Sequence, residues 1–323
     1  MSLRDARILA DRRRAFTRAL ALLLALAALV PVARAESSEP APLAAKSLLL
    51  GIARAGGRLV AVGDRGHVLV SGDDGSTWTQ VLVPTRAMLT SVSFPDARHG
   101  WAVGHDGVIL ATADGGTTWT RQDGGKDLET ILLSVLFLDS RRGFAVGAYG
   151  KFLSTGDGGA TWVAAKPSGG DAHFNAIAAG PDGELYLAGE SGTLLLSRDG
   201  GREWSRSEVP YDGSLFGVLP LGNRELLTYG LRGHILDSSD DGATWVPHNS
   251  VRTSLIMTGV RLDDGTVVLA GQGGIFHVRH ANDLNFAAWK PADFGGSIAA
   301  LVAATDGAIV TVGEAGAVRI TLP

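Results

Sequence analysis

The side chains in this sequence that are best placed to recognise a partner are arginines and a tyrosine in predicted loops. Arg65 and Arg232 occupy equivalent positions in two copies of an internal repeat, each directly before a glycine. Binding residues concentrate on loops that a constant scaffold positions. The predicted recognition patch comprises Arg65, Arg86, Arg232, Arg252 and Tyr211. The alternative interpretation is that these are ordinary solvated turn residues.

Arginine and tyrosine together also suggest glycoside hydrolysis of the sialidase kind. That chemistry needs an arginine cluster for a substrate carboxylate, an acidic proton donor, and a tyrosine nucleophile activated by a glutamate. The available tyrosines and two glutamates that could lie near them are Tyr149, Tyr186, Tyr211, Tyr229, Glu190 and Glu225. No Arg-Ile-Pro-type segment precedes the first repeat, where that class places its first arginine. We therefore predict no enzymatic activity, and keep a sialidase-like hydrolase and a carbohydrate- or small-ligand-binding protein as alternatives.

The sequence offers little for metal, thiol or phosphate chemistry. It contains no cysteine, and its eight histidines are scattered without a His-Glu-x-x-His motif. Neither a phosphate-binding Gly-x-x-x-x-Gly-Lys loop nor a Gly-x-Ser-x-Gly elbow occurs. We predict no metal site and no cofactor.

An eight-residue motif recurs five times and organises the rest of the chain. It begins with Ser or Thr, carries Asp third and Gly fifth, and ends in Trp; its aspartates lie 41, 43, 42 and 41 residues apart. We call this motif the Asp box. Its aspartates, glycines and tryptophans are Asp73, Gly75, Trp78, Asp114, Gly116, Trp119, Asp157, Gly159, Trp162, Asp199, Gly201, Trp204, Asp240, Gly242 and Trp245. Such a period indicates a repeat architecture in which each unit packs on its neighbours.

The Asp box has a mechanical interpretation as a tight turn between two strands. The aspartate accepts backbone N–H bonds inside the turn, and the glycine supplies a backbone conformation with positive φ. Each tryptophan then enters the next strand and packs between adjacent sheets. Calcium binding at Asp73-Asp74 or Asp240-Asp241 is an alternative, but these spacings lack an EF-hand pattern.

Each repeat contains four short apolar strands separated by Gly/Asp turns, which predicts one antiparallel sheet. The seven repeats begin near Leu48, Leu89, Leu132, Phe174, Leu215, Leu255 and Ile298. The sixth has a degraded box, although Trp289 survives in its expected fourth strand, and the seventh contains three strands. We predict an all-β, seven-bladed β-propeller of four-stranded antiparallel blades over residues 48–323. Within the N-terminal segment 36–47, Ala41–Ser47 is expected to supply the closing strand.

The N-terminal residues 1–35 have the order of a cleavable signal peptide. A cationic segment with six arginines precedes an apolar run from Ala19 to Val32, and Ala33-Arg34-Ala35 ends it. Fourteen apolar residues fall short of the roughly 20 needed to span a bilayer. We expect cleavage after Ala35 and a periplasmic or otherwise extracytoplasmic location, with no transmembrane segment afterwards. The export route, Sec or twin-arginine, stays open.

Removal of residues 1–35 makes the chain acidic. Those residues hold seven of the 29 basic and two of the 33 acidic side chains, so 22 basic and 31 acidic side chains remain. An acidic domain is poorly suited to binding the phosphates of nucleic acids. No nucleic-acid partner is therefore predicted.

The boxes, together with a preceding Ala-Val-Gly-x-x-Gly element, resemble the photosystem II stability/assembly factor family. This element spans Ala61 to Gly66, Ala102 to Gly107 and Ala145 to Gly150. The resemblance covers roughly residues 45–323. It implies an exported seven-bladed propeller that acts without catalysis, as a scaffold whose protein partners are subunits of an envelope membrane complex. We expect the protein to be a monomer.

Overall fold

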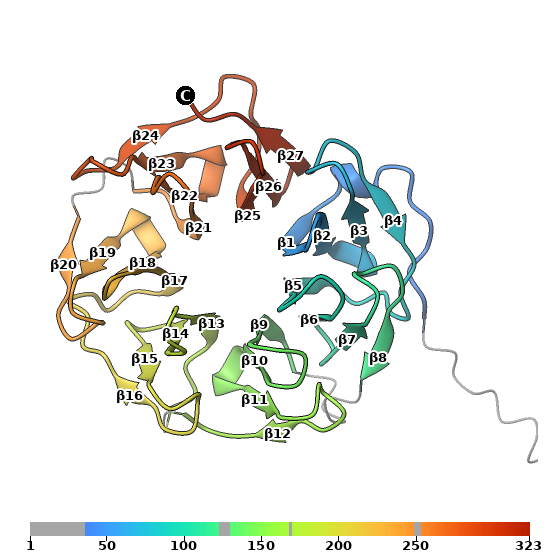
Figure 1. Cartoon of the computed structure of the whole chain (residues 1–323), viewed down its shortest axis with the longest axis horizontal. Coiled ribbons are helices and arrows are strands. Elements are labelled where there is room, and N and C mark those ends of the chain that lie inside the picture. Colours follow the sequence, from blue (N-terminus) through green and yellow to red (C-terminus); the bar gives the residue numbers. More distant parts are fainter. Residues whose placement is uncertain (1–35, 123–129, 168–169, 249–252) are drawn as a thin grey trace, which may run out of the picture. The chain divides into compact units, whose positions relative to one another are not determined.

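The chain folds into short antiparallel strands arranged as consecutive sheets around a ring (Figure 1). The computed structural model describes residues 36–122, 130–167, 170–248 and 253–323. The described part of residues 37–323 contains seven sheets, or blades, in chain order. The prediction of a seven-bladed β-propeller is confirmed. The predicted signal peptide, residues 1–35, lies outside the described residues.

The first four blades each contain four strands. Blade 1 contains β1 (Leu49–Ala55), β2 (Arg58–Gly63), β3 (Val68–Ser71) and β4 (Thr79–Val81). Blade 2 contains β5 (Leu89–Ser93), β6 (Gly100–Gly104), β7 (Ile109–Thr112) and β8 (Thr120–Gln122). Blade 3 contains β9 (Leu132–Phe137), β10 (Gly143–Gly147), β11 (Phe152–Thr155) and β12 (Val163–Ala164). Blade 4 contains β13 (Phe174–Ala179), β14 (Leu185–Gly189), β15 (Leu194–Ser197) and β16 (Ser205–Arg206).

Blades 5 and 6 repeat this plan, and blade 7 has three strands in the described part of the chain. Blade 5 contains β17 (Leu215–Gly222), β18 (Glu225–Gly230), β19 (Ile235–Ser238) and β20 (Val246–Pro247). Blade 6 contains β21 (Ile256–Arg261), β22 (Val267–Gly271), β23 (Phe276–Arg279) and β24 (Ala287–Trp289). Blade 7 contains β25 (Ile298–Ala303), β26 (Ile309–Gly313) and β27 (Gly316–Ile320). Short 3-10 helices are η1 (Ala44–Lys46), η2 (Asp64–Gly66), η3 (Ala148–Gly150), η4 (Leu231–Gly233) and η5 (Gln272–Gly274).

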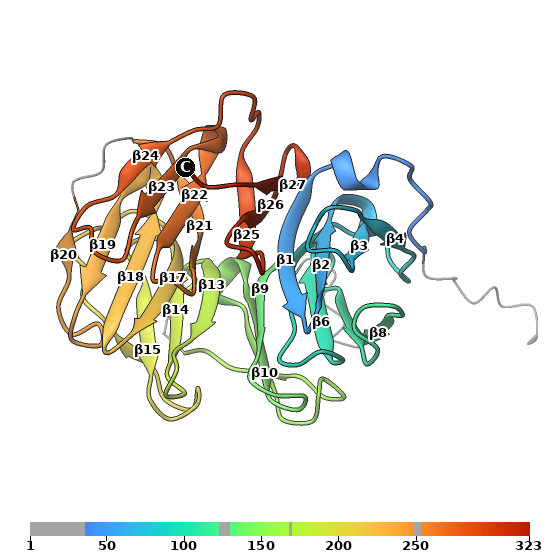
Figure 2. The ribbon, with the colours of Figure 1, turned by 45° about the horizontal axis from the view of Figure 1, so that its top comes forward.

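The hydrophobic core lies between neighbouring blades, and the second strand of each sheet is its most deeply buried part. Every residue of β6, β10, β14, β22 and β26 is buried, because blades pack on both faces of this strand. The first strands line the centre of the ring, and the last strands of blades 1–6 lie at its rim (Figures 1 and 2). This explains why the second strands are continuous apolar runs rather than alternating ones.

The glycine that ends each second strand marks a close approach of two backbones. A Cβ atom on Gly104 would lie 2.0 Å from the carbonyl oxygen of Met88, and one on Gly147 would lie 2.0 Å from that of Ile131. Those carbonyl groups directly precede the first strand of the same blade. The same contact recurs at Gly63, Gly189, Gly230, Gly271 and Gly313. The glycine of the Ala-Val-Gly element is thus a packing requirement that recurs in every blade.

The closure of the ring differs from the predicted addition of an N-terminal strand to blade 7. Ala44–Lys46 forms the 3-10 helix η1, and β27 pairs only with β26 among the described residues. The preceding residues instead follow the rim of blade 1, where Gln80 Nε2 donates to Glu39 O (2.9 Å) and Ala41 N donates to Gln80 Oε1 (2.7 Å). Prolines at positions 40 and 42 explain the difference, because proline has no N–H to donate to a sheet.

Candidate functional site

Each Asp box is a turn whose polar groups satisfy one another. Asp73 Oδ1 accepts from Ser71 Oγ (2.7 Å) and Thr77 N (2.8 Å), and Asp73 Oδ2 accepts from Thr77 Oγ1 (2.5 Å). Ser71 Oγ in turn accepts from Gly75 N (2.8 Å), where Gly75 has φ +87°. Hydrogen bonds from the threonine four residues on hold the pKa of Asp73, and likewise of Asp157 and Asp240, at about 2. These carboxylates are therefore ionised and fully engaged in the turn.

The box tryptophans fill the spaces between blades. Trp119 is 6% exposed and packs in a cluster with residues of blades 1 and 2, while its Nε1 donates to Gly116 O (2.9 Å). Trp245 packs between blades 4 and 5, and its Nε1 donates to Ser207 Oγ (2.8 Å). Each box thus joins its blade to the preceding one.

In blade 6, a different residue fills the space between blades that the box tryptophan fills in blades 1–5. Phe286 lies 41 residues after Trp245 and belongs to the buried cluster between blades 5 and 6. Trp289 lies in the fourth strand as predicted, but it packs between blades 6 and 7, with its ring 5.3 Å from that of Phe276. Phe286, rather than Trp289, therefore occupies the slot of a box tryptophan.

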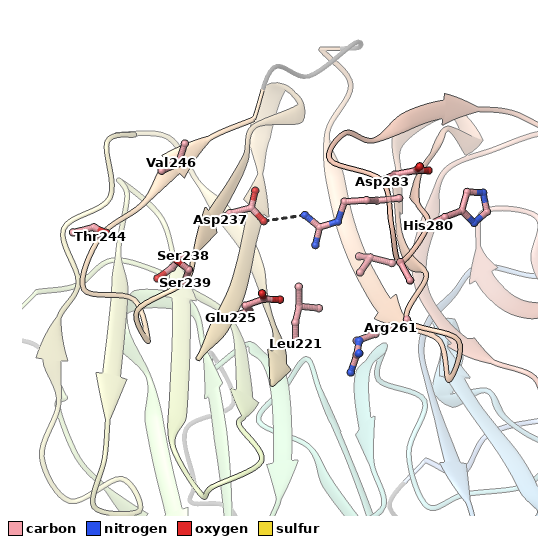
Figure 3. A pocket seen from close by; sticks show the side chains of 14 residues that line it. Leu221, Glu225, Asp237, Ser238, Ser239, Thr244, Val246, Arg261, His280 and Asp283 are labelled. Carbon is pink, nitrogen blue, oxygen red and sulfur yellow. Dashed lines mark hydrogen bonds and ion pairs between the residues drawn. The ribbon is translucent and has the colours of Figure 1, made fainter. Parts of the chain in front are cut away.

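The degraded box leaves a polar cleft of about 360 Å³ between blades 5 and 6 (Figure 3). Arg279 occupies the position of the first box serine. Its Nη1 donates a hydrogen bond to Asp237 Oδ1 of blade 5 (3.2 Å). His248 also pairs with Asp237, and the guanidinium of Arg279 lies 5.0 Å from the ring centre of Phe286. The residue equivalent to Asp237 in blade 4, directly before the first box serine, is Leu196. An ionic contact thus replaces an apolar one at this interface.

Two further hollows adjoin the turn between β21 and β22. One, of about 340 Å³, is lined by residues of blades 6 and 7, among them Asp263, Asp264 and Leu322. The other, of about 510 Å³ and more open, borders Arg261 and the corresponding turns of blades 4 and 5. All three hollows lie on the box face, the side of the ring that carries the Asp boxes. The described residues of the predicted recognition patch lie elsewhere, and the degraded box in the sequence was the signal for these hollows.

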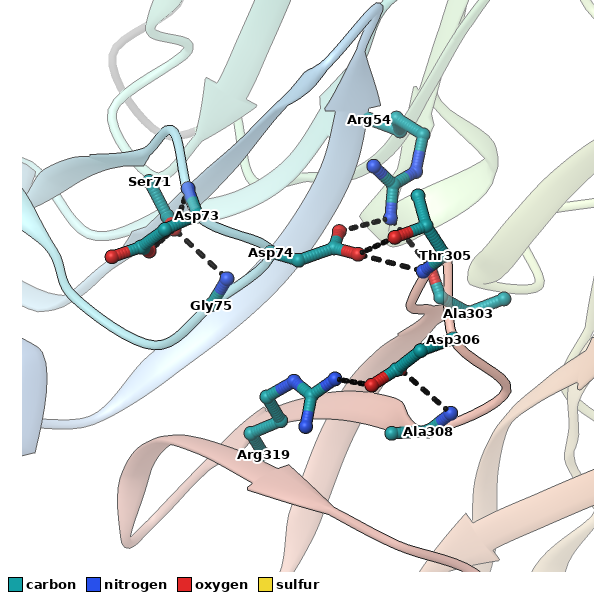
Figure 4. A network of polar contacts seen from close by, with 10 residues as sticks. All are labelled: Arg54, Ser71, Asp73, Asp74, Gly75, Ala303, Thr305, Asp306, Ala308 and Arg319. Carbon is teal, nitrogen blue, oxygen red and sulfur yellow. Dashed lines mark hydrogen bonds and ion pairs between the residues drawn. The ribbon is translucent and has the colours of Figure 1, made fainter.

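Blades 1 and 7 meet through a second polar network, centred on Asp74 in the box of blade 1 (Figure 4). Asp74 Oδ1 pairs with Arg54 Nη2 (2.7 Å), and Asp74 Oδ2 accepts from Thr305 N (2.6 Å). Arg54 Nη2 also donates to Ala303 O of blade 7 (2.7 Å). Burial opposes ionisation of Asp74, but the bonds from Thr305 and Arg54 outweigh it and hold its pKa at about 2. This network joins the first blade to the last.

On the opposite side of the ring, which we call the loop face, six of the blades hold two consecutive left-handed residues in the turn between the second and third strands, and the second of the two is always glycine. In five blades the first of the two is exposed and is not glycine: Arg65 (φ 52°), Asp106 (φ 56°), Tyr149 (φ 54°), Ser191 (φ 53°) and Arg232 (φ 56°). Blade 6 has Gly273 there (φ 69°). Arginine and tyrosine are not residue types that favour this strained conformation. We call these five residues the display positions.

The predicted recognition patch divides into two parts on this face. Arg65, with 75% of its side chain exposed, and Arg86, which pairs with Glu39 (2.9 Å), belong to the blade 1–2 region. Arg232 and Tyr211 belong to blade 5 and the loop before it, on the other side of the ring (Figure 1). Tyr211 stacks on His234, with ring centres 4.1 Å apart. Arg252 lies outside the described residues.

The family model described as "Photosynthesis system II assembly factor YCF48" matches residues 70–128 and 125–321. This chain belongs to the YCF48 family. The photosystem II assembly lipoprotein Ycf48 of Synechocystis sp. (strain ATCC 27184 / PCC 6803 / Kazusa) is 37% identical over 76 residues. That alignment spans 22% of this chain and 22% of the relative's length.

Solved YCF48 structures have the same fold as this family member. One, described as YCF48 bound to D1 peptide, aligns with a TM-score of 0.70 and 19% identity, over 91% of this chain and 97% of the other. YCF48 from Cyanidioschyzon merolae aligns with a TM-score of 0.70 and 18% identity, over 87% and 97%. In the described residues of this chain, no helix is long and apolar enough to cross a membrane.

Burial opposes activation of three of the four tyrosines as the nucleophile that sialidase chemistry needs. An activated nucleophile has a lowered pKa or an adjacent base. Burial instead raises the pKa of Tyr186 to about 12, and burial also raises the pKa of Tyr229 and Tyr211. Tyr149 is 74% exposed, and its ring lies 4.8 Å from that of His173. Among the described residues, no group of three or more His, Asp or Glu side chains could hold a metal ion.

Proposed function

We propose that this protein is an exported, non-catalytic scaffold that binds protein partners during assembly or stabilisation of an envelope membrane complex. Membership of the YCF48 family supports the assembly role. One solved relative is described as bound to a D1 peptide, which supports a peptide segment of a membrane-complex subunit as the partner. The partner contacts the loop face, through Arg65 and Arg232 in particular.

The observation that carries this proposal is the backbone strain at the display positions. A non-glycine residue in the left-handed region costs roughly 1 kcal/mol, and glycine would avoid that cost. Five blades nevertheless hold an exposed side chain other than glycine at this position, and two of the five are arginines. Strained exposed positions of this kind cluster at functional sites. The rigid ring holds these side chains on one face, which suits recognition of a partner.

The test is co-purification of the tagged protein from intact cells after mild cross-linking. Wild type should retain a membrane-complex subunit, and Arg65→Ala/Arg232→Ala should retain at least fivefold less of it. The matched control is Arg141→Ala/Arg202→Ala, which removes two exposed arginines from the box face and should retain the subunit. Equal retention by both double variants would place the interface elsewhere. Absence of any membrane-protein partner with wild type would remove the proposal.

Export and oligomeric state have direct tests. Mass spectrometry of the protein from a periplasmic fraction should find Glu36 at the N-terminus, as cleavage after Ala35 requires. Light scattering should give the mass of one chain. Retention of residues 1–35 in the purified protein, or a dimeric mass, would contradict these two parts of the proposal.

The cleft between blades 5 and 6 favours a second candidate, binding of a small polar ligand. Glu225 and Asp237 line it from blade 5, Arg261 and Arg279 from blade 6, and Ser238 adds a hydroxyl group. A glycan array with the wild-type protein tests this candidate. A bound glycan whose signal disappears in Glu225→Gln would support it, and an array without signal would exclude glycans as the ligand.

A further inference from the structure

In blade 7 the third strand forms the outer edge of the sheet, whereas in the other described blades a fourth strand covers the third. In blade 1 the third strand pairs with a fourth through Val68↔Val81 and Val70↔Thr79, and blades 2–6 contain corresponding pairs. In blade 7 the third strand, β27, pairs only with β26 among the described residues. Alternate residues of an edge strand direct their N–H and C=O groups outward, where they can pair with another chain.

The edge adjoins a hollow suited to the side chains of an added strand. Ile320, the last residue of β27, is buried against blade 6, in a cluster that includes Trp289. The hollow of about 340 Å³ begins just beyond it, where Leu262, Ala304 and Leu322 supply apolar surface. A strand beside β27 would therefore place one of its side chains over an apolar floor, as the fourth strand of a complete blade does.

The charges around this hollow are mainly acidic. Asp263 and Asp264 line it, and Asp264 Oδ1 accepts from Thr266 N within its own turn (2.8 Å). Arg319, a residue of β27 itself, is already paired with Asp306 (Figure 4). His280 also lines the hollow and contacts Thr266 Oγ1 through Nδ1 (3.3 Å). A basic side chain on the added strand complements the two turn aspartates.

The described N-terminal segment does not pair with β27, although the backbone of Ala45 and Lys46 lies against Gly316 at the start of this strand. Ser38 and Glu39 are held at the rim of blade 1, where Ser38 N donates to Val83 O (2.9 Å). The prolines at positions 40 and 42 also remove two donors from that segment. We propose that the β27 edge binds an extended segment of a partner protein as the missing fourth strand of blade 7. The segment has alternating apolar residues and a lysine or arginine that faces Asp263 and Asp264.

This inference rests on the proposed function in one respect, that the protein binds protein partners, but it uses a different surface. β-Strand addition obtains affinity from backbone hydrogen bonds and specificity from alternate side chains. Since the sequence contains no cysteine, a fluorophore can be attached at one introduced thiol. Thr321→Cys reports on the end of β27, and Thr120→Cys on β8, the paired outer strand of blade 2, is the matched control.

The probe is the peptide acetyl-Thr-Lys-Thr-Val-Thr-Val-Thr-amide, in which the lysine and both valines lie on one face of the strand, with two comparison peptides. In one, glutamate replaces the lysine; in the other, the lysine and the threonine that follows it exchange places, which moves the lysine to the opposite face. The probe peptide should change the fluorescence of labelled T321C in a saturable way and leave labelled T120C unchanged. Both comparison peptides should bind at least fivefold more weakly. Methylation of alternate backbone nitrogens should abolish binding for one set of positions and leave it for the other.

Two variants in the T321C background test the acidic hollow. Asp263→Asn/Asp264→Asn should weaken binding of the probe peptide about fivefold, as expected for two partly exposed ion pairs. The control Asp182→Asn/Glu208→Gln removes the same charge elsewhere and should leave affinity unchanged. The proposal is overturned if no peptide binds, if both methylated peptides bind equally, or if D263N/D264N binds as wild type. If the protein forms concentration-dependent dimers and the peptide dissociates them, a second copy of the chain covers the edge. If these assays fail while R65A/R232A loses its partner, only the strand-addition inference falls.

Discussion

Blades 1–5 and blades 6–7 form the same ring by different means. In blades 1–5 the Asp box satisfies its own turn, and its tryptophan packs against the preceding blade. Blade 6 has Phe286 and the cross-blade pair Arg279–Asp237 instead, and blade 7 has no fourth strand in the described chain. The cleft and the two further hollows described above all border blade 6. The repeat thus specifies the fold, and its departures create the places where a ligand or strand can bind.

Aspartates in this ring either stabilise their own turn or contact a neighbouring blade. Asp73 forms bonds within its own turn, whereas Asp74 and Asp237 reach residues of a neighbouring blade. The interfaces between blades 5 and 6 and between blades 7 and 1 therefore carry charged cross-blade contacts in addition to apolar packing. Substitutions at matched positions can test this difference.

The largest effect is expected at a regular interface. Trp119→Ala should lower the free energy of unfolding by about 4 kcal/mol, because it empties a buried slot between blades 1 and 2 and removes the bond to Gly116 O. Urea unfolding followed by circular dichroism measures this. Trp119→Phe, which copies the residue of blade 6, should recover about half of the loss. A loss below 1 kcal/mol for W119A would mean that the box tryptophans do not hold the regular interfaces.

The ionic interface between blades 5 and 6 should respond differently. Arg279→Met should cost about 2 kcal/mol, because Asp237 then loses a partner in a partly buried site. Asp237→Leu/Arg279→Met should regain most of this loss, since leucine is the residue that blade 4 has at the equivalent position. The measurement is a double-mutant cycle of urea unfolding. Additive losses in the double variant would show that the pair does not act as a unit.

The sequence was sufficient for the blade count because the Asp box couples a local turn to an interblade contact. Its spacing locates each sheet, and the Gly at the end of each second strand has a steric cause that recurs in every blade. The closing segment could not be predicted from strand count alone, since the prolines at 40 and 42 decide against a strand. The cleft depends on Arg279 reaching Asp237, 42 residues away, and no local pattern indicates such a contact.

A box aspartate should show a smaller, pH-dependent effect. Burial opposes ionisation of Asp114, but bonds from Thr118 and Thr112 outweigh it and hold its pKa at about 2. A lowered pKa in the folded state adds stability above the unfolded value of 3.8, and this stability is lost as the pH falls through 2. Asp114→Asn should therefore lower the Tm by about 3 °C at pH 7 and by much less at pH 2. The exposed Asp182→Asn is the control, and an equal decrease at both pH values would contradict the assignment.

The smallest effect, of opposite sign, is expected on the loop face. Arg65→Gly gives blade 1 the residue type that blade 6 has at Gly273, and both positions have positive φ. Glycine relieves the strain of about 1 kcal/mol but gains freedom in the unfolded chain, so the net stabilisation should be about 0.5 kcal/mol. Arg65→Ala keeps the strain and should not stabilise the protein. If R65G is more stable than R65A and both lose the partner, the arginine is retained for recognition at a cost to the fold. If R65G is less stable than wild type, Arg65 contributes to the turn itself, and the strain argument for the display positions fails.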